Sequence, residues 1–110
     1  MGLTGQLEAT SRDGGIAFAF TVTNDGADPV SLDFESTLFA DFATFEDGRE
    51  IWRWSSGRAF AQTIVTETLE PGGSMTRTAT WSNPPPGAYA AVATLRASNH
   101  RLERTASVTV

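Results

Sequence analysis

The side chains that could perform catalysis are few in this chain of 110 residues. His100 is its one histidine, and it stands in the polar stretch SNHR, which is typical of a loop. Nucleophilic catalysis by a serine would need this histidine beside a serine and a carboxylate. The G-x-S-x-G turn that often carries such a serine is absent. We therefore expect no catalytic residue and no enzymatic activity.

Residues that could bind a metal or a cofactor are equally few. The chain has no cysteine, and so it has no thiolate ligand and no disulfide. Asp25, Asp28 and Asp47 stand in turn-forming stretches, where aspartates usually shape the turn, and no EF-hand spacing surrounds them. A phosphate-binding glycine loop and a basic patch are both missing. We expect no metal, no cofactor and no nucleic-acid partner.

A pair of tryptophans offers the clearest chemistry for binding. Trp52 and Trp54 are two residues apart, so on a strand both indoles share one face. We predict that both fill a core as structural anchors, each indole N–H meeting a backbone carbonyl. The alternative exposes an indole as an anchor for a protein partner or as a platform that stacks on a sugar ring. Three further aromatic residues are expected to be structural anchors: Phe60, Trp81 and Tyr89.

The side chains of Arg53 and Tyr89 carry polar groups for which we expect structural roles. Arg53 points away from the indoles, and we expect it to pair with Asp41 or Glu50. Tyr89 follows Gly87 by two residues and precedes an alternating strand, which is the spacing of a tyrosine corner. Its hydroxyl is therefore predicted to bond back to the chain and to have no catalytic role.

Three loops are candidates for contact with a partner. The first is a short polar loop that leaves the aromatic strand, and it comprises Ser55, Ser56, Gly57 and Arg58. The second is stiffened by proline and comprises Asn83, Pro84, Pro85 and Pro86. The third, weaker candidate spans residues 24–29. Each loop has a simpler reading as a turn or a rigid connection, with Gly57 at positive φ in the first.

The elements that must position these loops are strands, because apolar and polar residues alternate almost throughout. The expected strands cover residues 3–10, 15–24, 30–34, 41–45, 50–54, 60–69, 74–81, 89–95 and 104–110. Asp-Gly pairs at 13–14 and 47–48 predict tight hairpins. Eight or nine strands, with turns every 8–12 residues or so, favour a β-sandwich over a barrel.

The bulk composition bounds the class of protein. The length fits one domain over residues 1–110, and a hydrophobic fraction of 40% fits a globular protein. A net charge of −5 disfavours nucleic acid and anionic membranes as partners, and no apolar run approaches a membrane span. The first 15 residues show no signal peptide. We expect a cytoplasmic protein, with a domain cut from a longer secreted protein as the alternative.

The order of several segments resembles the intracellular proteinase inhibitor (BsuPI) family over roughly residues 5–97. The segments are TVTNDGADPVSLDF, FADFATFEDGREIWRWSSGRAF, TLEPGGS, a tryptophan and PGAYAAVATL, with DGREIWRWSSGRAF the most specific. The chain departs from the family pattern at residues 39–42, where FADF replaces a more usual tyrosine-aspartate-phenylalanine run. The resemblance implies an immunoglobulin-like β-sandwich, no catalysis, and inhibition of an intracellular subtilisin-type serine protease.

Three functions follow as hypotheses. The first is a protein-binding module that inhibits a subtilisin-like protease by inserting a loop into its cleft. The second is an accessory protein-interaction or assembly domain of the same fold, which binds through a sheet face or a free edge strand. The third is a carbohydrate-binding module that uses exposed tryptophans.

Overall fold

A computed structural model describes residues 2–110 as nine strands without a helix. In chain order the strands are β1 (Leu3–Arg12), β2 (Gly15–Asn24), β3 (Val30–Phe34), β4 (Ala40–Glu46), β5 (Arg49–Arg53), β6 (Val65–Leu69), β7 (Ser74–Ser82), β8 (Ala88–Leu95) and β9 (Glu103–Thr109). The predicted all-β class and strand number are confirmed. Within residues 2–110, no helix offers the length and apolar character needed to cross a membrane.

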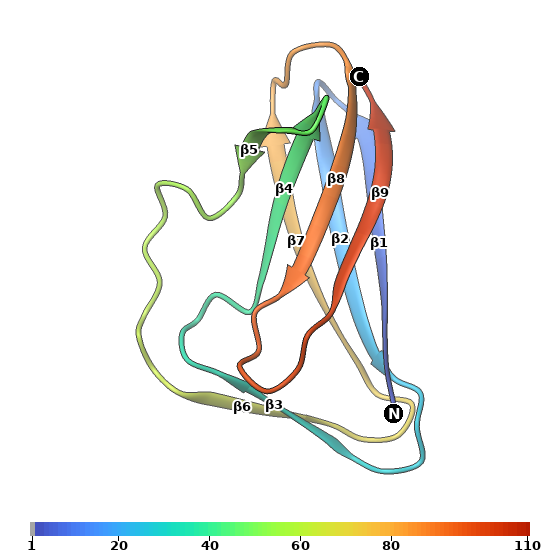
Figure 1. The fold of residues 1–110 in the computed structure, drawn as a ribbon, viewed down its shortest axis with the longest axis vertical. Helices are drawn as coiled ribbons and strands as arrows, with labels where there is room; N and C mark the ends of the chain where they lie inside the picture. Colours follow the sequence, from blue (N-terminus) through green and yellow to red (C-terminus); the bar gives the residue numbers. More distant parts are fainter. Residues whose placement is uncertain (1) are drawn as a thin grey trace.

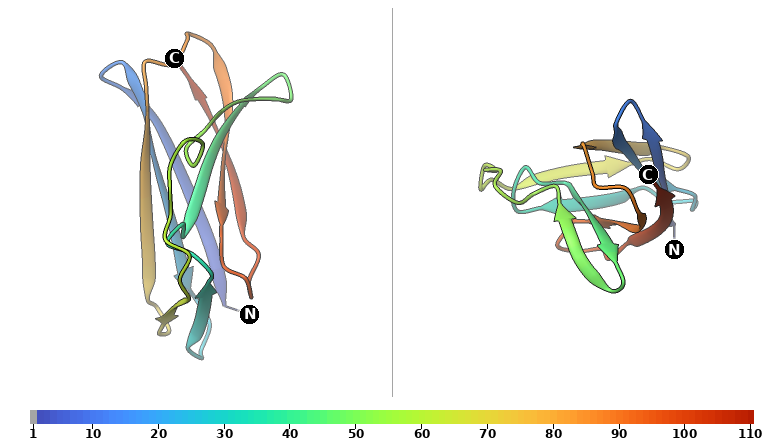
Figure 2. Two further views of the ribbon diagram at one scale, coloured as in Figure 1. Left: turned by 90° about the vertical axis from the view of Figure 1, so that its left-hand side faces the viewer. Right: turned by 90° about the horizontal axis from the view of Figure 1, so that it is seen from above.

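The strands form an antiparallel β-sandwich (Figure 1, Figure 2). One sheet has the order β1-β2-β7, the other β5-β4-β8-β9, and β3 and β6 form a separate two-stranded sheet. β1 and β9 lie side by side, and Arg104 Nε donates to the Gly5 carbonyl at 3.0 Å between them. The opposite side of the sandwich, between β5 and β7, is where the chain leaves the sheets in a long loop.

The core lies between the two larger sheets. The apolar face predicted for β2 is buried, and its largest members, Phe18 and Phe20, are at most 2% exposed. β8 contributes the small side chains Ala91 and Ala93, both fully buried. Phe42 of β4 packs on Phe18 with ring centroids 5.7 Å apart, so large side chains of one sheet meet large and small ones of the other.

The two Asp-Gly hairpins form as the sequence predicts. Asp13 and Gly14 have φ of 50° and 77°, and Asp47 and Gly48 have φ of 52° and 78°. A type I′ turn needs positive φ at both central residues, which glycine adopts freely and aspartate tolerates. These two turns set the register of β1 on β2 and of β4 on β5.

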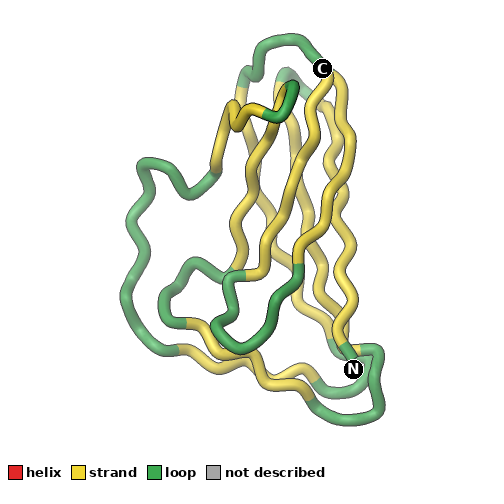
Figure 3. Tube along the Cα trace, in the orientation of Figure 1, coloured by secondary structure: helices red, strands yellow, loops and turns green. Residues whose placement is uncertain are grey.

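The strand expected over residues 60–69 is wrong in its first half. β6 begins only at Val65, where it pairs with Phe34 of β3. Residues 54–64 instead form a long loop that stands clear of the sandwich (Figure 3). This stretch leaves one sheet and crosses to β3, so its first residues find no neighbouring strand to pair with.

Candidate protein-binding site

The tryptophans lie on the open side of the sandwich, and both pack against the core. Trp52 stacks on Phe18 and on Trp81, with ring centroids 5.5 and 5.4 Å apart and an interplanar angle of 12° in both pairs. Tyr89 meets Trp81 edge-on at 5.2 Å. Trp52 therefore belongs to an aromatic column that closes the space between β5 and β7.

Trp54 lies beyond the end of β5 and does not join this column. Its backbone N–H donates to the Phe42 carbonyl at 2.8 Å, and its ring packs against Phe60 at 5.7 Å. Arg58 folds back over the Trp54 ring at 4.6 Å, and its Nε donates to the Trp54 carbonyl at 2.8 Å. The loop is thus packed around Trp54 at its base.

Residues 55–58, the first candidate loop, form a tight turn, here called the 55–58 turn. Arg58 N donates to the Ser55 carbonyl at 3.1 Å, and Gly57 has a φ of 78°. A type II turn requires a positive φ at its third position alone, and this requirement explains why residue 57 is a glycine. Ser56 N also donates to the Arg53 carbonyl at 3.2 Å. The 55–58 turn is therefore a folded unit with a fixed shape.

Asp41 of β4 holds the 55–58 turn in place. This carboxylate is only 4% exposed, and it accepts hydrogen bonds from Ser55 Oγ at 2.6 Å and from Ser55 N at 3.1 Å. Arg53 NH1 lies 3.2 Å from the same carboxylate, while Arg53 NH2 lies 2.7 Å from Glu50. The pKa of the Arg53 guanidinium is raised, chiefly by its hydrogen bonds to Glu50. Charge-assisted bonds of this kind fix geometry well.

The sequence reading identified the ion-pair partners of Arg53 but not the role of Asp41 toward Ser55. A signal was present, because Asp41 is a charged residue inside the otherwise apolar run FADFA. A charge in such a run must find partners when both faces of its strand are covered. Which partners it finds could not be read from the pattern, because Ser55 is 14 positions away.

Residues 59–64 continue from the turn as an exposed segment, here called the arm. Ala61 is held by Thr37, since Ala61 N donates to Thr37 Oγ1 and Thr37 N donates to the Ala61 carbonyl, each at 3.0 Å. Beyond it, Ile64 has a side chain that is 81% exposed. Among residues 2–110, nothing forms a backbone hydrogen bond with residues 62–64. The sequence reading missed the arm because it assigned these residues to a strand.

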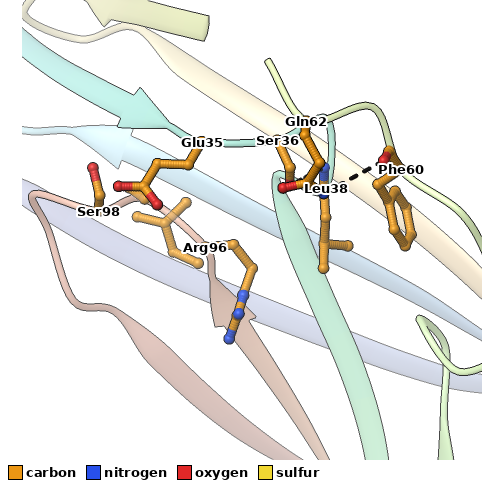
Figure 4. A pocket seen from close by; sticks show the side chains of 9 residues that line it. Glu35, Ser36, Leu38, Phe60, Gln62, Arg96 and Ser98 are labelled. Carbon is orange, nitrogen blue, oxygen red and sulfur yellow. Dashed lines mark hydrogen bonds between the residues drawn. The ribbon is translucent and has the colours of Figure 1, made fainter. Parts of the chain in front are cut away.

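A groove of about 540 Å³ lies beside the arm (Figure 4). Phe60 and Gln62 of the arm form one wall, and Gln62 Nε2 donates to the Phe60 carbonyl at 3.5 Å. Leu38 forms part of the floor, and Glu35 and Arg96 place opposite charges on the other walls. The arm and this groove together present both apolar and charged groups, and the 55–58 turn directly precedes the arm in the chain.

A comparison with known families identifies the family of the chain. The family model described as intracellular proteinase inhibitor, BsuPI, matches residues 3–100. The chain belongs to the BsuPI family. The family name indicates a proteinase inhibitor, a protein as the partner and a role that is not catalytic. Among curated proteins, no sequence matches this chain.

In this BsuPI chain the second candidate loop, residues 83–86, is a clasp between strands. Asn83 N donates to the Gly14 carbonyl at 2.9 Å, and Tyr89 donates its hydroxyl proton to the Pro85 carbonyl, which is the bond of a tyrosine corner. Gly87 exchanges two backbone bonds with Val110, at 3.1 and 2.8 Å. Pro84 is buried. The backbone polar groups of this loop thus form hydrogen bonds within the fold.

The third loop of this BsuPI chain is organised by Asn24, which is fully buried. Its amide Nδ2 donates to the carbonyls of Asp28 and Leu69, both at 2.8 Å, and its Oδ1 accepts from Gly26 N at 3.0 Å. Within residues 2–110, no three acidic, histidine or cysteine side chains gather where a metal ion could be held. This loop is therefore shaped by one buried amide.

Proposed function

We propose that this protein inhibits an intracellular subtilisin-like serine protease by steric occlusion, with the 55–58 turn and the arm entering the protease cleft. The observation that carries the proposal is the contrast within one loop. Its base is fixed by the buried Asp41, and within the described residues 2–110 the backbone groups of its outer part, residues 62–64, have no hydrogen-bond partner. No covalent chemistry is required of the inhibitor.

The physical reason is the way proteases bind chains. A substrate lies extended in the cleft and adds to the enzyme as a strand, through main-chain hydrogen bonds, while side chains fill pockets. An inhibitor that presents such a segment already ordered avoids most of the entropic cost of binding. Ser55, Ser56, Gly57 and Arg58 shape the base, and the arm supplies the extended segment.

The test is inhibition of peptide hydrolysis by several purified subtilisin-type proteases. We expect inhibition at or below micromolar concentrations of the protein. Ser56 and Pro86 are both exposed, so Ser56→Glu in the turn and Pro86→Glu in the clasp form a matched pair. Ser56→Glu should weaken inhibition and Pro86→Glu should not. Unchanged hydrolysis at tens of micromolar across all the proteases would reject the proposal.

A second candidate function, an accessory protein-interaction domain, is favoured by the edge of β7. This nine-residue strand pairs with β2 alone, which leaves its other edge open in the sheet. Its one charged residue, Arg77, contacts Glu67 at 3.6 Å and lies over Phe39. An edge with few charges can accept a partner strand. A concentration-dependent dimer in sedimentation experiments would support this function, and a strict monomer would count against self-assembly.

A carbohydrate-binding role has less support. Trp52 stacks on Phe18 and Trp81, and Trp54 is covered by Arg58 and Phe60. A sugar-binding platform needs an indole face open to solvent. These contacts argue against one at either tryptophan, and quencher-resistant tryptophan fluorescence would check this directly.

A further inference from the structure

We infer that Ile64 is the residue that fills the specificity pocket of the target protease, and that this pocket is apolar. The inference rests on the proposed function and names the contact residue and the class of protease within it. A single exposed apolar side chain is ordinary on a protein surface, so exposure alone does not single out Ile64. What singles out Ile64 is the hydrogen bonding of the backbone on either side of it.

Residues 62–64 form a short span fixed at both ends. On one side, Ala61 exchanges hydrogen bonds with Thr37 through both its N–H and its carbonyl. On the other side, Val65 enters β6 and pairs with Phe34 of β3. Between these points the backbone makes no hydrogen bond within residues 2–110. The span therefore offers main-chain groups to a cleft while both of its ends are held, which is the arrangement that a substrate-like segment requires.

The neighbouring side chains are already engaged within the protein. Ser55 is bonded to Asp41, and Gln62 reaches back to the Phe60 carbonyl. The Phe60 ring packs on Trp54. Of the large apolar side chains in residues 2–110, two are exposed, and Ile64 at 81% is twice as exposed as Ile51 at 40%. Ile64 is the large side chain of the arm that is free to enter a pocket.

The class of pocket follows from the charges near the arm. A trypsin-like pocket carries a carboxylate and needs a free lysine or arginine. The nearest cation in the sequence, Arg58, donates from Nε to the Trp54 carbonyl at 2.8 Å, and its guanidinium lies over the Trp54 ring. Arg96 lines the groove beside the arm but belongs to the segment after β8, so it is not part of the span that would enter the cleft. Isoleucine suits an apolar pocket, and burying its side chain is worth about 10- to 100-fold in affinity.

The experiment measures inhibition constants of the full chain against a subtilisin-type protease and against trypsin. The variant Ile64→Asp removes the apolar contact and adds a charge, and we expect it to weaken inhibition of the subtilisin-type protease by about 100-fold. Ile51→Asp is the matched control on β5, and inhibition should stay within about threefold of the parent chain. Both substitutions are at exposed positions, and equal melting temperatures will show that both variants are folded.

The outcomes separate the two proposals. Inhibition that survives Ile64→Asp, or that is as strong against trypsin as against the subtilisin-type protease, would overturn this inference and leave the proposed function standing. A parent chain that inhibits no subtilisin-type protease rejects the proposed function, and this inference falls with it. Loss of inhibition in Ile64→Asp with retention in Ile51→Asp supports both.

Discussion

The loop of residues 54–64 and the loop of residues 83–87 are both rigid, but they use their backbone groups differently. The second contains three prolines without N–H groups, and its remaining donors, Asn83 N and Gly87 N, bond to Gly14 and Val110. It has no backbone N–H left to offer a partner. The first is held at Ser55 and Ala61, and no acceptor in the part of the chain that the structure describes bonds to the N–H groups of residues 62–64.

The difference shows that rigidity alone does not identify a binding loop. Proline stiffens a chain because its ring fixes φ, but it also lacks the N–H donor that strand-like recognition by a protease uses. Anchoring by side chains, as Asp41 and Thr37 do here, fixes a segment and leaves its main chain available. The contrast predicts which substitutions affect stability together with inhibition and which affect stability alone.

The largest expected effect is that of Asp41→Asn. This change keeps the size of the side chain but removes the charge that accepts from Ser55 and Arg53, and the new amide group opposes the Arg53 donor. We expect a loss of about 2–3 kcal/mol in the free energy of unfolding, measured by urea denaturation, together with weaker inhibition. Asp28→Asn is the matched control, because Asp28 is exposed. Equal stability of the two variants would contradict the anchoring role of Asp41.

Tyr89→Phe should have a smaller effect, and on stability alone. The variant keeps the ring against Trp81 but loses the hydroxyl bond to Pro85. We expect the melting temperature to fall by roughly 5 °C while the inhibition constant stays unchanged. A change of inhibition as large as that in Asp41→Asn would remove the distinction between the two loops.

Arg58→Ala tests the packing around Trp54. It removes the cation–π contact and the bond to the Trp54 carbonyl, at an expected cost of about 0.5–1 kcal/mol. The Trp54 ring should become more accessible, so acrylamide should quench the fluorescence more strongly. Arg49→Ala, an exposed arginine on β5, is the control and should change neither quantity. Unchanged quenching in Arg58→Ala would show that Arg58 does not cover the ring in solution.

The smallest expected effect appears only in alkali. The pKa of Tyr89 is raised, first by desolvation and then by the negative charge of Glu46. The folded state thus binds the phenolic proton more tightly than the unfolded state. The resulting stabilisation is complete below the ordinary tyrosine pKa of about 10 and is lost as pH rises through the higher folded pKa.

This pH dependence can be measured without ambiguity, because Tyr89 is the one tyrosine in the chain. A phenolate absorbance titration therefore reports Tyr89 alone, and its midpoint should lie above that of the unfolded chain. The melting temperature of the parent chain should fall toward that of Tyr89→Phe as Tyr89 ionises. A midpoint at or below the unfolded value would contradict the raised pKa.

The sequence by itself determined the features that depend on near neighbours along the chain. Alternation along β2 predicted its buried face, and the Asp-Gly pairs predicted two tight hairpins, whose central residues have positive φ in the structure. The spacing of Gly87 and Tyr89 predicted that the Tyr89 hydroxyl bonds back to the chain, and the structure shows the Pro85 carbonyl as its acceptor. Each of these rests on local geometry: side chains alternate on any strand, and glycine can adopt positive φ where a turn requires it.

Only the tertiary structure decided which residues find distant partners. The run TIVTET is rich in β-branched residues throughout, yet Val65 pairs with Phe34 while Ile64 has no strand partner among residues 2–110. A strand exists only where another chain segment supplies hydrogen bonds, and propensity cannot tell where that segment ends. The same holds for Asp41, whose buried carboxylate accepts hydrogen bonds from Ser55 and Arg53 in a later part of the chain. Alternation and turn residues were therefore enough to predict the fold, whereas the arm could be recognised only from the tertiary structure, which shows where strand pairing begins.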